Sequence, residues 1–167
     1  MVKVYSGMSL NDLKILIKQS IKDITLEELY ELSFYFNEEK TYLPQEYKKK
    51  YTESVLNVTI NRLKLLKNDN ASYTGFLDNT DVTKINKLLQ HNDNVITYIL
   101  NIIVIYTTYF LKEPIHLPGT VFPGKVSIYF DGKNYYCPVK KHHINNKKSL
   151  CNICIAKSNK EGDYVKN

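Results

Sequence analysis

The sequence predicts a mainly α protein: a helical bundle with a C-terminal β-hairpin extension. Apolar residues recur at helical spacing through the first two thirds of the 167 residues, and the stretch from Val95 to Leu111 is almost continuously apolar. Proline, glycine and cysteine become frequent only after that stretch. We therefore expect a bundle over residues 1–112. Residues 113–167 should form a Pro/Gly linker, a hairpin and a cysteine-rich tail, packed on the bundle as one domain.

Two helix starts are readable near the N-terminus. Ser9 can cap a first helix that has Asp12 in its first turn. The sequence "TLEE" is a capping box, in which Thr25 and Glu28 exchange hydrogen bonds at the start of a second helix. The apolar positions that these helices should bury are Leu10, Leu13, Ile17 and Ile21 in the first, and Leu26, Leu29, Leu32 and Phe36 in the second.

A third helix should follow the break at Leu43-Pro44, because proline is well suited to a first helical position. It extends toward "KNDNAS", and its apolar face comprises Tyr47, Tyr51, Val55, Val58, Leu63 and Leu66. After a loop around Gly75, a fourth helical region begins near Thr83 and continues into the apolar run. We expect Ile85, Leu88 and Leu89 to belong to this region.

The apolar run from Val95 to Leu111 is only 17 residues long and contains Asn101, threonines and tyrosines. A membrane span needs roughly 20 consecutive apolar residues. The run is therefore interpreted as a buried central helix of the bundle, and no membrane association is expected. Its many β-branched residues leave a partial strand as the alternative.

The segment "EPIHLPGTVFPG" cannot continue a helix, because its prolines and glycines give a stiff, turning linker. The following "KVSIYFDGKNYYCPV" alternates like two strands around Asp131-Gly132. An Asp-Gly pair at this place predicts a hairpin with a two-residue type I′ turn. The chain then closes with a cysteine turn, a short element and a polar end.

Composition limits the classes of protein to consider. The N-terminal "MVKVYSGMSLNDLKILIKQS" is not an export signal, and three cysteines cannot all pair, so we expect a cytoplasmic protein with free thiols. The formal net charge is +6, and Cys137 to Asn167 contains seven lysines and two acidic residues. This excess could meet phosphate or acidic partners. Because Arg62 is the only arginine and lysine is common throughout, compositional drift is the preferred explanation.

The three cysteines predict a metal site. Cys151 and Cys154 have the C-x₂-C spacing that lets two sulfurs of one tight turn reach one ion, and Cys137 ends the second hairpin strand. We expect Zn²⁺ to staple the hairpin in the manner of a zinc ribbon, with an iron–sulfur cluster as the alternative cofactor. The 13 residues between Cys137 and Cys151 exclude a radical-enzyme cluster motif. A redox-active pair of Cys151 and Cys154 is a lesser alternative, because no βαβ pattern precedes it.

The fourth ligand of a tetrahedral site should be a histidine. His116 is preferred because Pro114 and Pro118 restrict its backbone before any metal binds. His143 is the second choice, since it lies with His142 in a loop rich in lysine and asparagine, where an exposed histidine needs no special role. His91 is expected to be structural.

Several motifs of this chain resemble one family. In order, they are "TYLPQEYKKKY", "HLPGTVFPG", "YYCPVK" and "LCNICIA". They are similar to the uncharacterised methanogen domain-of-unknown-function family 2115, often described as predicted metal-binding proteins. The family pattern is His-Pro-x-Gly-Thr-x-Phe-Pro-Gly, Tyr-Tyr-Cys-Pro-Val and Cys-x-Phe-Cys. His116, Cys137, Cys151 and Cys154 fall on the histidine and cysteine positions of this pattern.

This chain departs from the family pattern at three positions. Leu117 precedes Pro118, which replaces a small residue, and Ile153 replaces phenylalanine. None of these departures touches the ligand set. The resemblance spans nearly the whole chain, and it implies an archaeal, anaerobic cytosol without an established activity.

The resulting expectation is a non-catalytic binding or assembly protein with a structural Cys₃His zinc site and an unknown protein partner. A metalloenzyme is the alternative, with an open metal position on three cysteines and Glu113 or Asp131 as general acid–base. A second alternative is a nucleic-acid-binding module that uses the lysine-rich ribbon, with Tyr129, Tyr135 and Tyr136 as stacking groups. Because these tyrosines alternate faces, at least one face should pack on the bundle.

Overall fold

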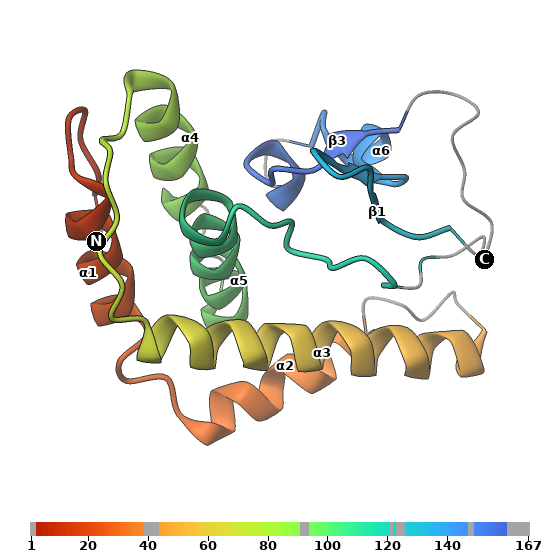
Figure 1. Cartoon of the computed structure of the whole chain (residues 1–167). Helices are drawn as coiled ribbons and strands as arrows, with labels where there is room; N and C mark the ends of the chain where they lie inside the picture. Colours follow the sequence, from red (N-terminus) through yellow and green to blue (C-terminus); the bar gives the residue numbers. More distant parts are fainter. Residues whose placement is uncertain are drawn as a thin grey trace.

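The fold is mainly helical, with a small three-stranded sheet near the C-terminus (Figure 1). The computed structural model describes residues 3–38, 44–90, 94–120, 122, 126–146 and 149–159. Its helices are α1 (Leu10–Ser20), α2 (Leu26–Glu38), α3 (Gln45–Asn68), α4 (Asn79–Gln90), α5 (Val95–Tyr106) and α6 (Lys140–His143), with a π-helical turn η1 (Thr107–Leu111) and a 3₁₀ turn η2 (Leu150–Asn152). Its strands are β1 (Tyr129–Phe130), β2 (Tyr135–Cys137) and β3 (Lys157–Ser158).

Local capping chemistry fixes where α1 and α2 begin, as predicted. The hydroxyl of Ser9 accepts a hydrogen bond from the backbone N–H of Asp12 at 3.0 Å. Before α2, the N–H of Thr25 donates to the Glu28 carboxylate at 2.7 Å, and the N–H of Glu28 donates to the Thr25 hydroxyl at 3.2 Å. Each bond satisfies a donor that the first helical turn would otherwise leave unpaired.

The long helix α3 starts one residue later than predicted, because Pro44 is its N-cap in extended conformation rather than its first helical residue. Of the predicted core positions on α1, α2 and α3, the described buried ones are Leu13, Ile17, Ile21, Leu32, Tyr51, Val55, Leu63 and Leu66. The side chains of Leu26, Leu29 and Phe36 lie outside the described set.

The prediction of one fourth helical region was wrong, because the segment forms two helices, α4 and α5. Asn94 is the N-cap of α5, with φ −158° and a side-chain oxygen that accepts from the N–H of Thr97 at 2.7 Å. Helix α4 also begins earlier than predicted, at Asn79 instead of near Thr83. His91, expected to be structural, lies outside the described residues.

Helix α5 is the centre of the bundle, as the apolar run predicted, and the strand alternative was wrong. It contacts α1, α2, α3 and α4 and stands among them in Figure 1. Most of its residues are buried, and Ile99, Ile102 and Ile105 are completely so. Within the described residues, no helix combines the length and apolar character needed to cross a membrane.

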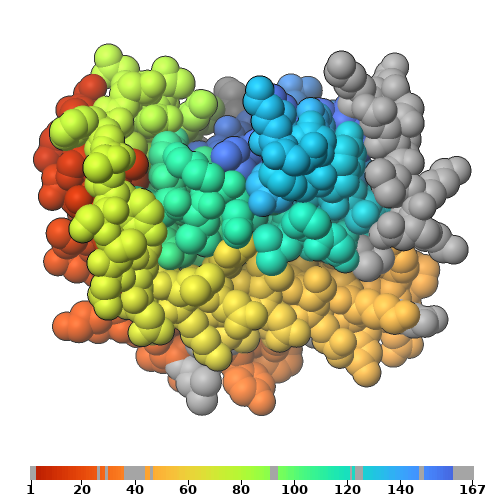
Figure 2. Space-filling model, viewed as in Figure 1, coloured from red at the N-terminus to blue at the C-terminus, as the bar shows by residue number. Residues whose placement is uncertain are grey.

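After η1 the chain leaves the bundle through a linker that lies along α3. The Tyr47 hydroxyl donates to the carbonyl of Phe122, and the rings of Tyr51 and Phe122 are 6.1 Å apart. Figure 2 shows the linker and the ribbon filling the space above α3. Pro114 and Thr120 are buried there, so the linker forms part of the packed interior.

The hairpin forms as predicted, but its turn is shifted by one residue. Tyr129 pairs with Tyr136, and Phe130 pairs with Tyr135. The N–H of Asp131 then donates to the carbonyl of Asn134 at 3.1 Å, so Gly132 and Lys133 are the central residues. Gly132 has φ 94° whereas φ of Lys133 is not positive, which is the pattern of a type II′ turn rather than type I′.

The third strand was not foreseen. β3 pairs in parallel with β2, so that Cys137 lies opposite Ser158. This pairing returns the chain to the hairpin after the cysteine turn and gives the sheet order β1-β2-β3.

The burial of α5 predicts a large difference between two isoleucine-to-alanine substitutions. Ile102→Ala removes a completely buried side chain and should lower the free energy of unfolding by about 2–5 kcal/mol. Ile15→Ala, on an α1 side chain that is 52% exposed, should change it by less than about 0.5 kcal/mol. Urea unfolding followed by circular dichroism measures both, and equal effects would contradict the central position of α5.

Candidate metal centre and polar network

Cys137 occupies the most constrained position of the three cysteines. It ends β2, is buried, and its sulfur accepts hydrogen bonds from the backbone N–H groups of Val139 and Lys140. These donors are available because the chain turns directly from the strand into α6 after Pro138. A sulfur that accepts two backbone N–H groups is oriented before any ligand arrives.

The pKa of the Cys137 thiol also depends on the other two cysteines. Burial raises its pKa to about 11, although the N–H groups of Val139 and Lys140 oppose this rise. Charges on Cys151 and Cys154 raise the pKa further. Cys151 and Cys154 therefore lie near enough to affect the pKa of Cys137, although 13 residues separate Cys137 from Cys151 in sequence.

Cys151 and Cys154 are held by a short turn. The Ser149 hydroxyl accepts from the N–H of Cys151 at 3.2 Å, and the N–H of Cys154 donates to the carbonyl of Leu150 at 3.0 Å. The Lys140 ammonium donates to the carbonyls of Cys154 at 2.8 Å and Ala156 at 2.6 Å. Lys140 thus links α6, which follows Cys137, to the segment after the other two cysteines.

The histidines lie at different places. The His116 ring packs edge-on against Phe122, with centroids 5.3 Å apart, and lines a cavity of about 50 Å³ that Leu150 also lines. His142 and His143 are exposed on α6. Within the described part of the chain, no three His, Cys, Asp or Glu side chains are close enough together to hold a metal ion.

The two carboxylates considered for acid–base catalysis have structural partners. Glu113 forms an ion pair with Arg62, and its N–H donates to the carbonyl of Thr107 at 3.0 Å. The Asp131 carboxylate accepts from the N–H groups of Asn134 at 2.6 Å and Lys133 at 2.8 Å, which lowers its pKa. Asp131 therefore acts as a turn residue, and the metalloenzyme alternative gains no support from these groups.

The tyrosines of the hairpin divide between its two faces. Tyr129 and Tyr136 stack across the strands, with centroids 5.0 Å apart and ring planes 14° apart. On the other face the rings of Tyr135 and Phe130 have centroids 4.6 Å apart, and Tyr135 also packs against the core. Two of the three predicted stacking groups therefore share a face that is separate from the packed one.

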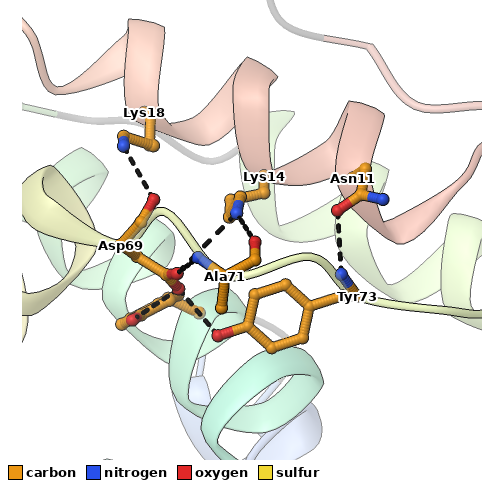
Figure 3. Close-up of polar contacts among 7 residues, drawn as sticks. Asn11, Lys14, Lys18, Asp69, Ala71 and Tyr73 are labelled. Atoms are coloured by element: carbon orange, nitrogen blue, oxygen red, sulfur yellow. Dashed lines mark hydrogen bonds and ion pairs between the residues drawn. The ribbon is translucent and has the colours of Figure 1, made fainter.

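A second polar cluster, which the sequence did not predict, lies where α3 ends (Figure 3). Asp69 is the C-cap of α3 and is 8% exposed. Its carboxylate accepts from the hydroxyls of Tyr73 at 2.7 Å and Tyr106 at 2.9 Å and from the N–H of Ala71 at 2.9 Å. The Lys14 ammonium of α1 is 3.7 Å from the same carboxylate and lies over the Tyr73 ring.

The Asp69 cluster fastens three parts of the bundle together. Lys18 adds a hydrogen bond from α1 to the Asp69 carbonyl at 2.8 Å, and Tyr106 comes from the end of α5. Burial alone would raise the pKa of Asp69, but the hydrogen bonds and the Lys14 charge outweigh it and lower the pKa. The same burial and contact raise the pKa of Tyr73 to about 12. A carboxylate that stays charged beside protonated tyrosines is suited to a structural role.

Comparison with known proteins places the chain in a family. The family model described as "Uncharacterized protein conserved in archaea (DUF2115)" matches residues 9–159. The chain belongs to this family. The resemblance seen in the cysteine and Pro/Gly motifs is thereby confirmed for the family itself.

Relatives of the DUF2115 chain come from methanogens. A UPF0305 protein of Methanothermobacter thermautotrophicus is 30% identical over 149 residues, covering 84% of this chain and 91% of the relative. Another from Methanocaldococcus jannaschii is 26% identical over 152 residues, covering 85% and 92%. No solved structure matches the chain significantly. These names assign no activity, so metal binding remains a prediction.

The Asp69 cluster predicts an acid-sensitive bundle. The pKa of Asp69 is lower in the folded state than in the unfolded chain. Its contribution to the free energy of unfolding is therefore complete above the unfolded-state pKa of about 3.9, and it is lost as the pH falls through the folded-state pKa. Asp69→Asn leaves Lys14 buried without its counter-charge and should cost about 3 kcal/mol near neutral pH.

The measurement is urea unfolding of wild type and Asp69→Asn at several pH values between about 2 and 7. The difference between the two proteins should shrink toward acid pH. In the double variant with Lys14→Met, much of the loss should be recovered, because the unpaired charge is gone. A constant difference across the pH range would contradict the assigned role.

Proposed function

We propose that this chain binds one Zn²⁺ ion through Cys137, Cys151 and Cys154, and that the ion closes the C-terminal ribbon of a non-catalytic binding or assembly protein. The observation that carries the proposal is the environment of Cys137. The backbone N–H groups of Val139 and Lys140 lower the pKa of its buried thiol, and Cys151 and Cys154 are near enough to raise it.

One part of the Cys137 environment, the two backbone N–H donors, suits a thiolate, and a bound cation would supply the missing counter-charge. Backbone N–H donors stabilise negative charge on sulfur, whereas burial without a counter-charge opposes it and gives the thiol a pKa of about 11. A bound cation would reverse that balance, since coordinating thiols deprotonate on metal binding. Thiolate-rich ligand sets select Zn²⁺, Cu⁺ or iron–sulfur clusters, and Zn²⁺ suits a closed tetrahedral site.

Binding would require the cysteine turn to move toward Cys137, because the described side chains do not form a ligand group at their present separation. The segment is suited to a small adjustment. The pairing of β3 with β2 and the hydrogen bonds of Lys140 to Cys154 and Ala156 anchor the chain at and after Cys154, so Cys151 can shift without loss of the ribbon. A protonated Cys137 thiol offers no attraction to draw them closer.

His116 is the proposed fourth ligand, with His143 as the alternative. His116 lies on the linker and lines a small cavity together with Leu150, the residue that precedes Cys151. This cavity gives the His116 ring space to turn toward the cysteine turn. His143 is exposed on α6, close in sequence to Cys137. A site closed by either histidine has no open position for substrate, which supports the non-catalytic role.

The first prediction concerns metal content after anaerobic purification. Wild-type protein should contain about one zinc ion per chain by elemental analysis, because three thiolates and one imidazole fill a tetrahedral site. Cys137→Ser, Cys151→Ser and Cys154→Ser should each lose most of the metal. The control Ile144→Ser, an exposed position in the same segment, should retain it.

Co²⁺ substitution distinguishes the outcomes further, since a four-coordinate thiolate site absorbs differently from one with bound water. Iron and sulfide in place of zinc would support the cluster alternative. Wild-type protein that neither retains nor takes up a thiophilic metal would contradict the proposal.

The second prediction separates the two histidines. If His116 is the fourth ligand, His116→Ala should lower zinc affinity by at least about tenfold, equivalent to about 1.4 kcal/mol. His143→Ala and His142→Ala, on exposed α6 side chains, should leave it unchanged. Competition with a zinc chelator gives the affinities, and the opposite ranking would transfer the role to His143.

A further inference from the structure

A groove that is lined in part by Ile153 and Ile155, the neighbours of Cys154, has features of a ligand site. We call it the Phe76 groove. It is lined by Phe76, Lys84 on α4, Tyr109 in η1, Lys112 just after η1, and Ile155 beyond the cysteines. Its volume of about 340 Å³ is within the usual range of small-molecule sites.

Phe76 is held in its exposed position by the backbone on both sides of it. The Gly7 N–H donates to the Leu77 carbonyl, and the Leu77 N–H donates to the Met8 carbonyl, both at 2.9 Å. Ser9 and Phe76 also form an isolated antiparallel bridge. Because neighbouring side chains of extended backbone point to opposite sides, Leu77 enters the core while the Phe76 side chain is 73% exposed. The backbone therefore holds Phe76 at the surface with its ring exposed.

The groove also presents two exposed lysines. Lys84 and Lys112 are exposed, and neither ammonium group forms an ion pair or hydrogen bond within the described part of the chain. Asp81 lies one turn before Lys84 and also lines the groove, but the two side chains form no ion pair within the described part of the chain. The Asp81 carboxylate instead accepts from the Tyr109 hydroxyl at 2.9 Å.

Lys112 is placed in the groove by an uncommon backbone conformation. It has φ 55° and ψ 41°, the left-handed region in which glycine is the usual residue and a side chain costs about 1–2 kcal/mol. Its N–H donates to the Thr107 carbonyl and so ends the π-helical turn. Strained residues and π-helical turns both occur frequently at ligand sites. The combination of a strained lysine with an exposed aromatic ring on an ordered backbone points to a ligand that uses both.

We propose that the Phe76 groove binds a small anion that carries an aromatic ring, of the nucleoside monophosphate class. The ring stacks on Phe76, which is a favourable and base-tolerant contact. The phosphate lies between the ammonium groups of Lys84 and Lys112, which bind it as point charges. Asp81 also lines the groove and opposes an anion, so the two ammonium groups must outweigh its charge.

This site does not depend on zinc. No predicted metal ligand lines the Phe76 groove, although Ile153 and Ile155 flank Cys154 and line it. The Thr108 hydroxyl donates to the Ile153 carbonyl at 3.2 Å and connects η1 to the cysteine turn. Failure of metal binding would therefore leave the groove unchanged, and failure of nucleotide binding would leave the cysteines unchanged.

The test is isothermal titration of the full chain with adenosine monophosphate, ribose 5-phosphate and adenosine. The nucleotide should bind with a Kd below about 1 mM, and at least about tenfold more tightly than either fragment. Equal affinity for ribose 5-phosphate would remove the role of Phe76, and equal affinity for adenosine would remove the role of the lysines. Either result, or no binding of the nucleotide, overturns the proposal.

Single substitutions test which side chains of the groove contact the nucleotide. Phe76→Ala and Lys84→Gln should each weaken nucleotide binding by about fivefold or more, whereas Lys87→Gln, exposed elsewhere on α4, should not. Asp81→Asn keeps an acceptor for Tyr109 but removes the repulsive charge, so it should tighten binding. A weaker nucleotide affinity for Asp81→Asn would contradict an anionic ligand.

Lys112→Gly gives an independent readout. It should raise the midpoint of thermal unfolding, because glycine adopts the left-handed conformation without cost, and it should weaken nucleotide binding. Lys112→Ala should weaken binding without the gain in stability. A glycine variant that is more stable and binds the nucleotide as well as wild type would show that Lys112 only ends η1, and would refute its role in the groove.

Discussion

Helix α5 can be buried on nearly all sides because neighbouring elements satisfy the polar groups that it carries. The Asn101 amide donates to the Leu88 carbonyl of α4 at 3.0 Å, and the Tyr106 hydroxyl donates to Asp69 at the end of α3. An unpaired buried polar group would cost about 1–3 kcal/mol, comparable to a substantial part of the stability of a small domain. The packing of α4 and of the α3 corner around α5 is therefore directional as well as apolar, and these hydrogen bonds fix how the helices are rotated.

The end of α5 also determines where the C-terminal part of the chain lies. The π-helical turn η1 continues from α5, and the left-handed Lys112 ends it and turns the backbone into the linker. The ion pair of Glu113 with Arg62 then attaches the start of the linker to α3. Thr108 in η1 also contacts the cysteine turn through Ile153. One short segment thus positions both the ribbon and the Phe76 groove, so an irregularity in the helix explains two surface features.

The parts of the fold that depend on adjacent residues could be predicted, and those that depend on distant partners could not. The caps at Ser9 and Thr25 use bonds between residues three positions apart, and the sequence identified both. The parallel pairing of β3 depends on a partner about 20 residues earlier, so periodicity gives no signal for it. The cysteines were recognisable by type and spacing. The Asp69 cluster was not, because its members come from α1, the loop after α3, and α5, and "KNDNAS" looks like an ordinary polar loop.

The ribbon differs from an isolated zinc finger in how much of its order comes from protein contacts. In zinc-finger peptides the metal supplies most of the folding free energy, because the chain without metal has almost no core. Here Cys137 and Ile153 belong to the same buried cluster as α5, and β3 is paired with β2 by backbone bonds. The cysteine segment is therefore largely ordered without an ion, so little conformational entropy would oppose the proposed binding. Zinc in such a site would adjust the geometry of the ribbon without deciding whether the helical bundle folds.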